Sequence, residues 1–353
     1  MNPNIIPCIS IRPSMFVTYD YYDGPRHNLQ KLFNFEPKPR PLATGFITAS
    51  ARKKINNLAE WFFWICRDPQ YSNFKKGTYH RFKCSFITLT LPSKQVHSDE
   101  LIKSQCLNQF FIELKNKHYV KHYLWRAEKQ VNGNIHFHVL CDRFILYSNL
   151  QSIWNRLTEK LGYVHRYSEE RKLFFSAGFK KSKYAITSER INAEYKSYKN
   201  GLREGWRNPP STNVKGIFHI KNLKNYIQKY IGKSENSPEK RISGKLWDCS
   251  YSLKIAAKAS GLVSNGVRDA IDYLIEKFPK RVIHKEYASI FLFPLDFLVS
   301  KGLSALTSIA ADFLEKYFPP PETFSLFDEI SLDPVKSVNL PSIKFNKQLR
   351  IQF

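Results

Sequence analysis

Residues 128–140 read EKQVNGNIHFHVL, and this segment has the pattern of a short β-hairpin. Alternate side chains of a strand share a face, so His136 and His138 are expected side by side. The letters VNG at 131–133 suit a three-residue loop that ends with a glycine at positive φ. That loop pairs Glu128 with His136 and brings a carboxylate to the histidine face.

A two-residue loop of Asn132 and Gly133 is the alternative, and it would pair Lys129 with His136 and turn Glu128 away. The three-residue loop is favoured because it completes a set of two imidazoles and one carboxylate. Such a set predicts a divalent-metal site with open coordination positions. On its own, a His-x-His pattern is more often an ordinary core or surface feature.

Residues 225–233 read NYIQKYIGK and contain the unit Tyr-x-x-Lys twice, as Tyr226 with Lys229 and Tyr230 with Lys233. In a helix, side chains four apart lie on one face, so both phenols would share a neighbourhood with the lysines. A nearby cation favours the phenolate and also binds phosphate, as phosphoryl transfer requires. The alternative is an amphipathic helix whose tyrosines are half-buried core.

Three short motifs follow one another along the chain: FITLTLP at 86–92, HFH at 136–138 and the paired Tyr-x-x-Lys units. They resemble the three ordered motifs of HUH (His-hydrophobic-His) endonucleases. Among these, the chain is most similar to rolling-circle replication initiators of microvirus-type single-stranded DNA bacteriophages. The resemblance covers about residues 40–255, and further similar words are WRAEKQ at 125–130, NGNIHFH at 132–138 and GKLW at 244–247. The long basic stretch between the second and third motifs departs from the family pattern.

The resemblance implies an enzyme that nicks single-stranded DNA at a replication origin. Tyr226 or Tyr230 would attack the scissile phosphate, assisted by the charges of Lys229 and Lys233, to leave a 5′-phosphotyrosine link and a free 3′-OH. The two histidines and Glu128 would bind Mg²⁺ or Mn²⁺. The implied partners are the origin single strand, a host helicase and a host polymerase, in the cytoplasm of a bacterial host.

Charge is the strongest signal in the composition, with 55 Lys and Arg against 30 Asp and Glu in 353 residues and a net charge of +25. Such a protein favours polyanions, and its binding to nucleic acid should depend strongly on salt. A ribosomal type of RNA binding or a peripheral membrane protein would show the same bulk charge. The six cysteines have no Cys-x-x-Cys spacing, which indicates reduced thiols.

Membrane insertion is not expected. The most apolar window, 290–299, is short and contains Pro294 and Asp296. The first thirteen residues lack the pattern of a secretory signal, so a cytoplasmic protein is expected. A Gly-rich loop followed by Lys-Ser or Lys-Thr is absent from the sequence, so unwinding would need a separate helicase.

The order of the predicted elements favours an α+β fold, with a central antiparallel sheet and helices mainly on one face, as in HUH endonucleases and RRM-like domains. A mostly helical C-terminal extension is expected to follow. Strand patterns occur at 82–91, 122–130, 134–142, 163–167 and 215–220. Helix patterns occur at 51–66, 98–117, 146–161, around Tyr226, 270–278 and 303–317.

Three regions are predicted: an irregular arm at 1–45, an endonuclease domain at 46–255, and an extension with a tail at 256–353. The domain would carry a basic insertion at about 168–214, in which aromatic residues alternate with Lys and Arg. This mixture suits a groove where bases stack on rings while cations follow the phosphates. The alternative for the insertion is a flexible, solvated loop.

Two rival functions remain open. A relaxase or transposase would use the same chemistry, although two tyrosines argue against single-tyrosine transposases and the length is short for a relaxase–helicase fusion. A non-catalytic basic nucleic-acid-binding protein would have histidines with only a structural role. A metal titration distinguishes the latter, because a binding protein shows no metal-dependent cleavage.

Overall fold

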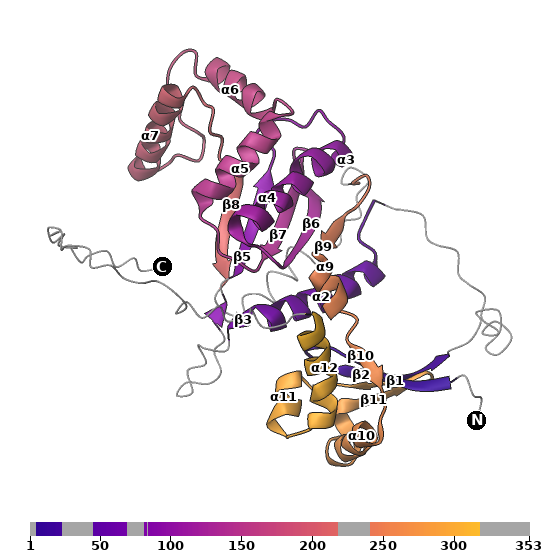
Figure 1. The fold of residues 1–353 in the computed structure, drawn as a ribbon. Coiled ribbons are helices and arrows are strands. Elements are labelled where there is room, and N and C mark those ends of the chain that lie inside the picture. The colour runs from indigo at the N-terminus through magenta and orange to yellow at the C-terminus, as the bar shows by residue number, and fades with distance from the viewer. Residues whose placement is uncertain (1–4, 23–44, 69–80, 83, 218–240, 318–353) are drawn as a thin grey trace, which may run out of the picture. The chain divides into compact units, whose positions relative to one another are not determined.

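The computed structural model describes residues 5–22, 45–68, 81–82, 84–217 and 241–317 (Figure 1). These residues form an α+β fold with two five-stranded antiparallel sheets, as predicted for the fold class. A separate two-stranded ladder joins β3 (Arg67–Asp68) and β4 (Arg81–Phe82). Within the described ranges, no helix has both the length and the hydropathy needed to cross a membrane.

The first sheet has the strand order β8-β5-β7-β6-β9, and every pair is antiparallel. Its centre is the predicted hairpin, which is confirmed as β6 and β7. The predicted strand at 82–91 is confirmed as β5. The bounds are β5 (Cys84–Thr90), β6 (Tyr123–Lys129), β7 (Ile135–Cys141), β8 (Thr212–Ile217) and β9 (Trp247–Cys249).

Helices cover one face of this sheet. Side chains that alternate along the strands, such as Leu89 and Phe137, are fully buried against Phe110 and Trp154 of these helices. The Trp154 indole also donates a hydrogen bond of 2.7 Å to the carbonyl of Thr90. The predicted helices at 98–117 and 146–161 are therefore confirmed. Their bounds are α3 (Asp99–Ile102), a π-helical turn (Lys103–Leu107), α4 (Asn108–His118) and α5 (Tyr147–Glu159).

The opposite face is only partly covered by helices. α2 (Ala49–Cys66) and α9 (Tyr251–Ala256) pack on the part of it formed by Phe86, Leu124 and Leu140. Because side chains alternate along a strand, His138 and His136 lie on the same face as Leu140, further along β7. Polar residues therefore occupy the part of this face beyond the apolar contact with the helices.

Residues 163–204 form two further helices, α6 (Tyr163–Phe174) and α7 (Ser188–Glu204). The strand expected at 163–167 is therefore wrong. Gly162, at φ 73°, separates α5 from α6, and Tyr163, Val164 and Ser168 are buried at helical spacing. The short alternation of apolar residues in this segment had resembled a strand.

The second sheet has the order β10-β1-β2-β12-β11 and draws strands from both ends of the described chain. The irregular arm expected at 1–45 is wrong for residues 5–22, and the extension contains three strands besides its helices. Ile9, Ile11, Phe16 and Phe291 are buried in the core of this sheet. Its strands are β1 (Ile5–Ile11), β2 (Phe16–Tyr22), β10 (Ser260–Leu262), β11 (Val282–Lys285) and β12 (Ala288–Phe291).

The helices predicted at 270–278 and 303–317 are confirmed as α10 and α12. Leu274 of α10 and Leu306 of α12 are fully buried in the same core as β1 and β2. The helical bounds are α10 (Asn265–Lys277), a 3-10 turn (Pro279–Arg281), α11 (Leu295–Ser300) and α12 (Ser304–Tyr317). The three-region division of the chain remains a prediction.

Candidate metal centre

The hairpin loop has the predicted three-residue form. The backbone N–H of Gln130 donates to the carbonyl of Asn134 at 2.9 Å, and Gly133 closes the loop at φ 82°. Glu128 consequently pairs with His136 across the ladder. The two-residue alternative, which would have turned Glu128 away, is wrong.

The loop is held by a hydrogen-bond network with the segment before α3. The side-chain amide of Asn134 donates to the carbonyl of Ser93 at 2.8 Å, and its oxygen accepts from the backbone N–H of Gln95 at 2.8 Å. Lys129, on the strand beside Glu128, forms a buried ion pair of 2.7 Å with Asp99. These contacts fix the end of the hairpin that carries His136.

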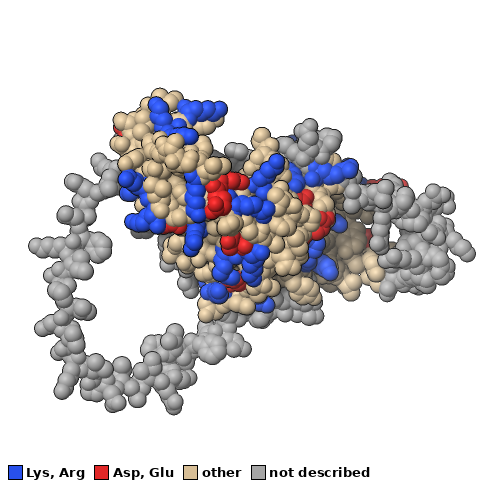
Figure 2. Space-filling model, turned by 90° about the horizontal axis from the view of Figure 1, so that it is seen from above, with Lys and Arg blue, Asp and Glu red and all other residues tan. Residues whose placement is uncertain are grey.

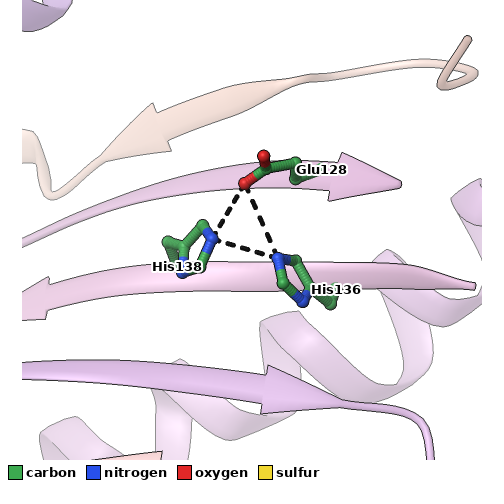
Figure 3. A group of neighbouring side chains, drawn as sticks. All are labelled: Glu128, His136 and His138. Carbon is green, nitrogen blue, oxygen red and sulfur yellow. Dashed lines mark hydrogen bonds and ion pairs between the residues drawn. The ribbon is translucent and has the colours of Figure 1, made fainter. Parts of the chain in front are cut away.

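Three side chains from the two strands converge on one point (Figure 3). Oε2 of Glu128 lies 2.8 Å from Nε2 of His138 and 3.6 Å from Nε2 of His136. The two imidazole Nε2 atoms are 3.0 Å apart. All three residues offer ligand atoms within 4.8 Å of one another.

This donor set fits a divalent cation. Two ligands bound at about 2.1 Å and at right angles around an octahedral ion lie roughly 3.0 Å apart, close to the separations of the three atoms. Two imidazole nitrogens and one carboxylate oxygen suit Mn²⁺ and other borderline cations, and the carboxylate also suits Mg²⁺. A cation would satisfy two imidazole nitrogens that otherwise face each other at hydrogen-bond distance.

The local charges favour the ligand-competent forms. Burial opposes ionisation of Glu128, but hydrogen bonds from His136 and His138 and the charge of Arg126 outweigh it and hold the carboxyl pKa well below its usual range. Burial lowers the pKa of His138, and the neighbouring His136 and Arg126 act in the same direction against Glu128. An ionised carboxylate and a neutral imidazole are the forms that bind metal.

Two further residues of this face contact His138 or pair with it, and sequence reasoning did not identify them. The hydroxyl of Thr88, on β5, lies 3.3 Å from His138 Nδ1. Arg126 is directly opposite His138 in the ladder and is 4% exposed. The period of two along β6 was a signal for Arg126, because it lies on the same face as Glu128. Thr88 could be found only once the register between β5 and β7 was known.

The predicted catalytic residues Tyr226, Tyr230, Lys229 and Lys233 lie outside the residues that the structure describes. Their roles therefore stay predictions. The part of the site that the structure brings together is the metal-binding half.

Comparison with known proteins adds one finding about the family. Residues 84–235 match the family model of the replication-associated protein ORF2. This range contains the three candidate ligands and extends over both predicted tyrosines. No curated protein matches the chain.

One solved structure is similar, the N-terminal origin-recognition/nickase domain of non-structural protein 1 from the emerging human bocavirus. It shares 11% sequence identity, and the alignment covers 57% of this chain and 97% of that chain, with a TM-score of 0.19. That likeness is too weak to carry an argument. The family match supports a replication-associated protein.

Proposed function

We propose that the chain is a rolling-circle replication initiator that nicks single-stranded DNA at an origin by metal-assisted tyrosine transesterification. One observation carries the proposal: the donor atoms of Glu128, His136 and His138 converge within 4.8 Å, inside the segment that matches a replication-associated family. The net charge of +25 supports a nucleic-acid substrate.

In this proposal, Glu128, His136 and His138 hold Mg²⁺ or Mn²⁺. The bound cation supplies positive charge to a non-bridging oxygen of the scissile phosphate. The phenolate oxygen of Tyr226 or Tyr230 bonds to phosphorus as the bond to the 3′ oxygen breaks, and that oxygen takes up a proton to become a free 3′-OH.

Rejoining is the reverse of cleavage. One phosphodiester is exchanged for another, so the 3′-OH can attack the 5′-phosphotyrosine and release the tyrosine. Lys229 and Lys233 would stabilise the phenolate and the phosphate through charge. The second tyrosine would cleave the regenerated origin while the first remains attached to DNA.

The sequence motifs place this activity in a small single-stranded DNA phage of the microvirus type. The partners would then be the origin single strand, a host helicase and a host polymerase, in the bacterial cytoplasm. A relaxase or transposase of the same chemistry is the rival, and identification of the nicked phosphate within an origin or a transfer site distinguishes them.

The test is formation of a covalent adduct. With Mn²⁺ and single-stranded origin DNA, the wild type should give a protein–DNA adduct that survives denaturing electrophoresis. Changing Tyr226→Phe and Tyr230→Phe together should remove the adduct, while the single control Tyr251→Phe, an exposed tyrosine on α9, should retain it. Adduct yield unchanged in the double variant contradicts the assignment of the nucleophile.

A second variant tests the metal ligands separately from DNA binding. His136→Ala should abolish cleavage but leave most of the affinity for the single strand, because affinity rests on the basic surface. Nicking by the wild type that persists in the presence of EDTA contradicts the proposed ligand set. A protein that binds DNA but never cleaves with any divalent cation would be the non-catalytic alternative.

A further inference from the structure

α6 and α7 form, with the segment between them and the residues that follow, a basic helical unit spanning residues 163–210 (Figure 1). It holds 11 Lys and Arg against 5 Asp and Glu. Figure 2 looks down onto the side where Figure 1 places these helices, and Lys and Arg cover more of that face than Asp and Glu. This distribution provides an attractive surface for phosphates.

Aromatic rings form the interior of this unit. Phe175 stacks on Trp206 with ring centroids 5.0 Å apart and planes 9° apart, and Tyr198 lies 5.0 Å from Phe175. Phe179 contacts Tyr198 at 5.5 Å. The helices of the unit are thus held together by aromatic contacts, whereas α7 has no buried residue of its own.

A cavity of about 460 Å³ opens among these rings. Cations lie at its wall: Arg171 is 5.2 Å from the ring of Tyr167, and Lys180 is 5.5 Å from the ring of Phe174. All four of these residues line the cavity together with Trp206. The cavity therefore combines aromatic surfaces with positive charge at its edge.

Trp206 carries a second, independent indication of a ligand. Its side chain is 8% exposed, and its indole Nε1 is buried without a hydrogen-bond partner among the described residues. The residue has φ 59°, an unusual conformation for a bulky side chain, and follows Gly205 at φ 61°. A Cβ on Gly201 would lie 2.2 Å from the Trp206 ring, so the helix is bare where the indole rests. A buried N–H donor with no partner is costly, and a ligand with an acceptor would satisfy it.

The cavity is continuous in sequence with the end of the sheet that carries His136. Asn208 and Pro210 line the cavity, and the next residue, Ser211, accepts a hydrogen bond of 2.8 Å from the backbone N–H of Thr90. Thr90 is the partner of His136 in the ladder between β5 and β7. The aromatic cavity and the candidate metal centre are thus connected through the edge strand β8.

We propose that this aromatic cavity binds one unpaired base of the single strand, with Arg171 and Lys180 on its flanking phosphates. The proposal rests on the proposed function and adds a specific nucleotide contact away from the scissile bond. Only an unstacked base presents both ring faces, which aromatic side chains bind, and every base carries an acceptor that an indole N–H can reach. A paired base hides its faces in the stack.

The test measures affinity in EDTA, so that cleavage does not enter. Origin-derived oligonucleotides that each carry a single abasic site are titrated against full-length wild type, Phe174→Ala and Tyr184→Ala. Phe174 is 50% exposed and lines the cavity; Tyr184 is 61% exposed, also lies beside a lysine, and does not line it. Both substitutions remove an exposed ring from the same unit, so the Tyr184 variant is the matched control.

Loss of one base–aromatic stack costs about tenfold in affinity. We expect one or two abasic positions to weaken wild-type binding by that factor. Phe174→Ala should weaken binding of the intact strand similarly and be insensitive to those positions, whereas Tyr184→Ala should behave as wild type. Equal sensitivity of all three proteins, or equal losses at every position, overturns the proposal.

The outcome is separable from that of the adduct experiment. His136→Ala should keep the position-specific abasic effect, because the cavity does not depend on the metal ligands. If no adduct forms but the abasic effect follows Phe174, the nuclease is wrong and the base site stands. If the adduct forms and the abasic effect is missing, the nuclease stands and the base site is wrong.

Discussion

At the scale of single residues, Thr88 sets the orientation of a candidate metal ligand. Its hydroxyl lies 3.3 Å from His138 Nδ1, so it holds the ring with Nε2 toward Glu128. The ring of Phe86 packs on the same imidazole, with centroids 5.4 Å apart. Partners of this kind fix the tautomer and the position of a metal-binding histidine.

We therefore predict that Thr88→Val, which keeps the shape and removes the hydroxyl, lowers the affinity for Mn²⁺ by about tenfold. Isothermal titration measures this directly. Thr90→Val is the matched control, since that hydroxyl lies on the same strand but donates to the backbone carbonyl of Ser211 at 2.9 Å. Thr88→Ser should restore the affinity. An unchanged Mn²⁺ affinity in Thr88→Val would show that the hydroxyl does not position His138.

The residues that the sequence predicted and those it missed differ in the range of information they need. Glu128, His136 and His138 follow from one hairpin whose loop length is encoded locally in 131–133. The contact between Thr88 and His138 depends on the pairing of strands 50 residues apart, which no local pattern specifies. The same limit hides any group that reaches the site from a distant segment.

At the scale of elements, strongly periodic segments were predictable and short ones were not. α2 and α5 have long apolar faces, and both were predicted within a few residues of their bounds. The five residues at 163–167 alternate over a length that a helix and a strand share, and the helix forms because Tyr163 and Val164 pack at helical spacing. Tertiary packing decided that case.

The start of β6 contains a buried histidine that should make the fold sensitive to acid. Burial, helped by the charge of Lys121, lowers the pKa of His122 to about 4. Its Nδ1 lies 2.7 Å from the hydroxyl of Ser252, which ties β6 to α9. An unfolded histidine has a pKa of about 6.5, so the unfolded state binds the proton more readily.

The stabilising contribution of neutral His122 is thus complete above about pH 6.5 and is lost as the pH falls toward 4. Up to about 3 kcal/mol is involved, at 1.36 kcal/mol for each pKa unit. We predict that His122→Gln flattens the fall in unfolding free energy between pH 7 and pH 4.5, measured by urea denaturation. His284→Gln is the control, an exposed histidine that also contacts a serine hydroxyl, at 2.9 Å. Parallel curves for His122→Gln and wild type would contradict the assignment.

At the scale of the whole molecule, the second sheet could not be predicted because its strands come from opposite ends of the sequence. β2 pairs with β12, so Phe16 lies opposite Phe291. Neither the Pro-rich start of the chain nor the apolar segment near 290 indicates its partner. The two rings stack at 4.4 Å with planes 6° apart, and both are buried.

One helix joins the cores of the two sheets. Trp61 of α2 belongs to the core of the second sheet, and the next residue, Phe62, belongs to the core behind the first sheet. Both side chains are fully buried. Disruption of either core should therefore weaken the packing of α2 on the other, and the two sheets should unfold as one cooperative unit.

We predict that Phe16→Ala lowers the free energy of unfolding by about 3–5 kcal/mol, the usual cost of removing a buried aromatic ring. Tyr21→Ala, on the same strand but 51% exposed, should cost much less. Mn²⁺ binds only the folded first sheet, so at about 100 times its Kd it should return about 2.7 kcal/mol to the Phe16 variant if unfolding is shared. Thermal unfolding followed by circular dichroism, with and without Mn²⁺, checks both statements. Two transitions, of which Mn²⁺ moves only one, would show that the sheets unfold independently and that α2 does not couple them.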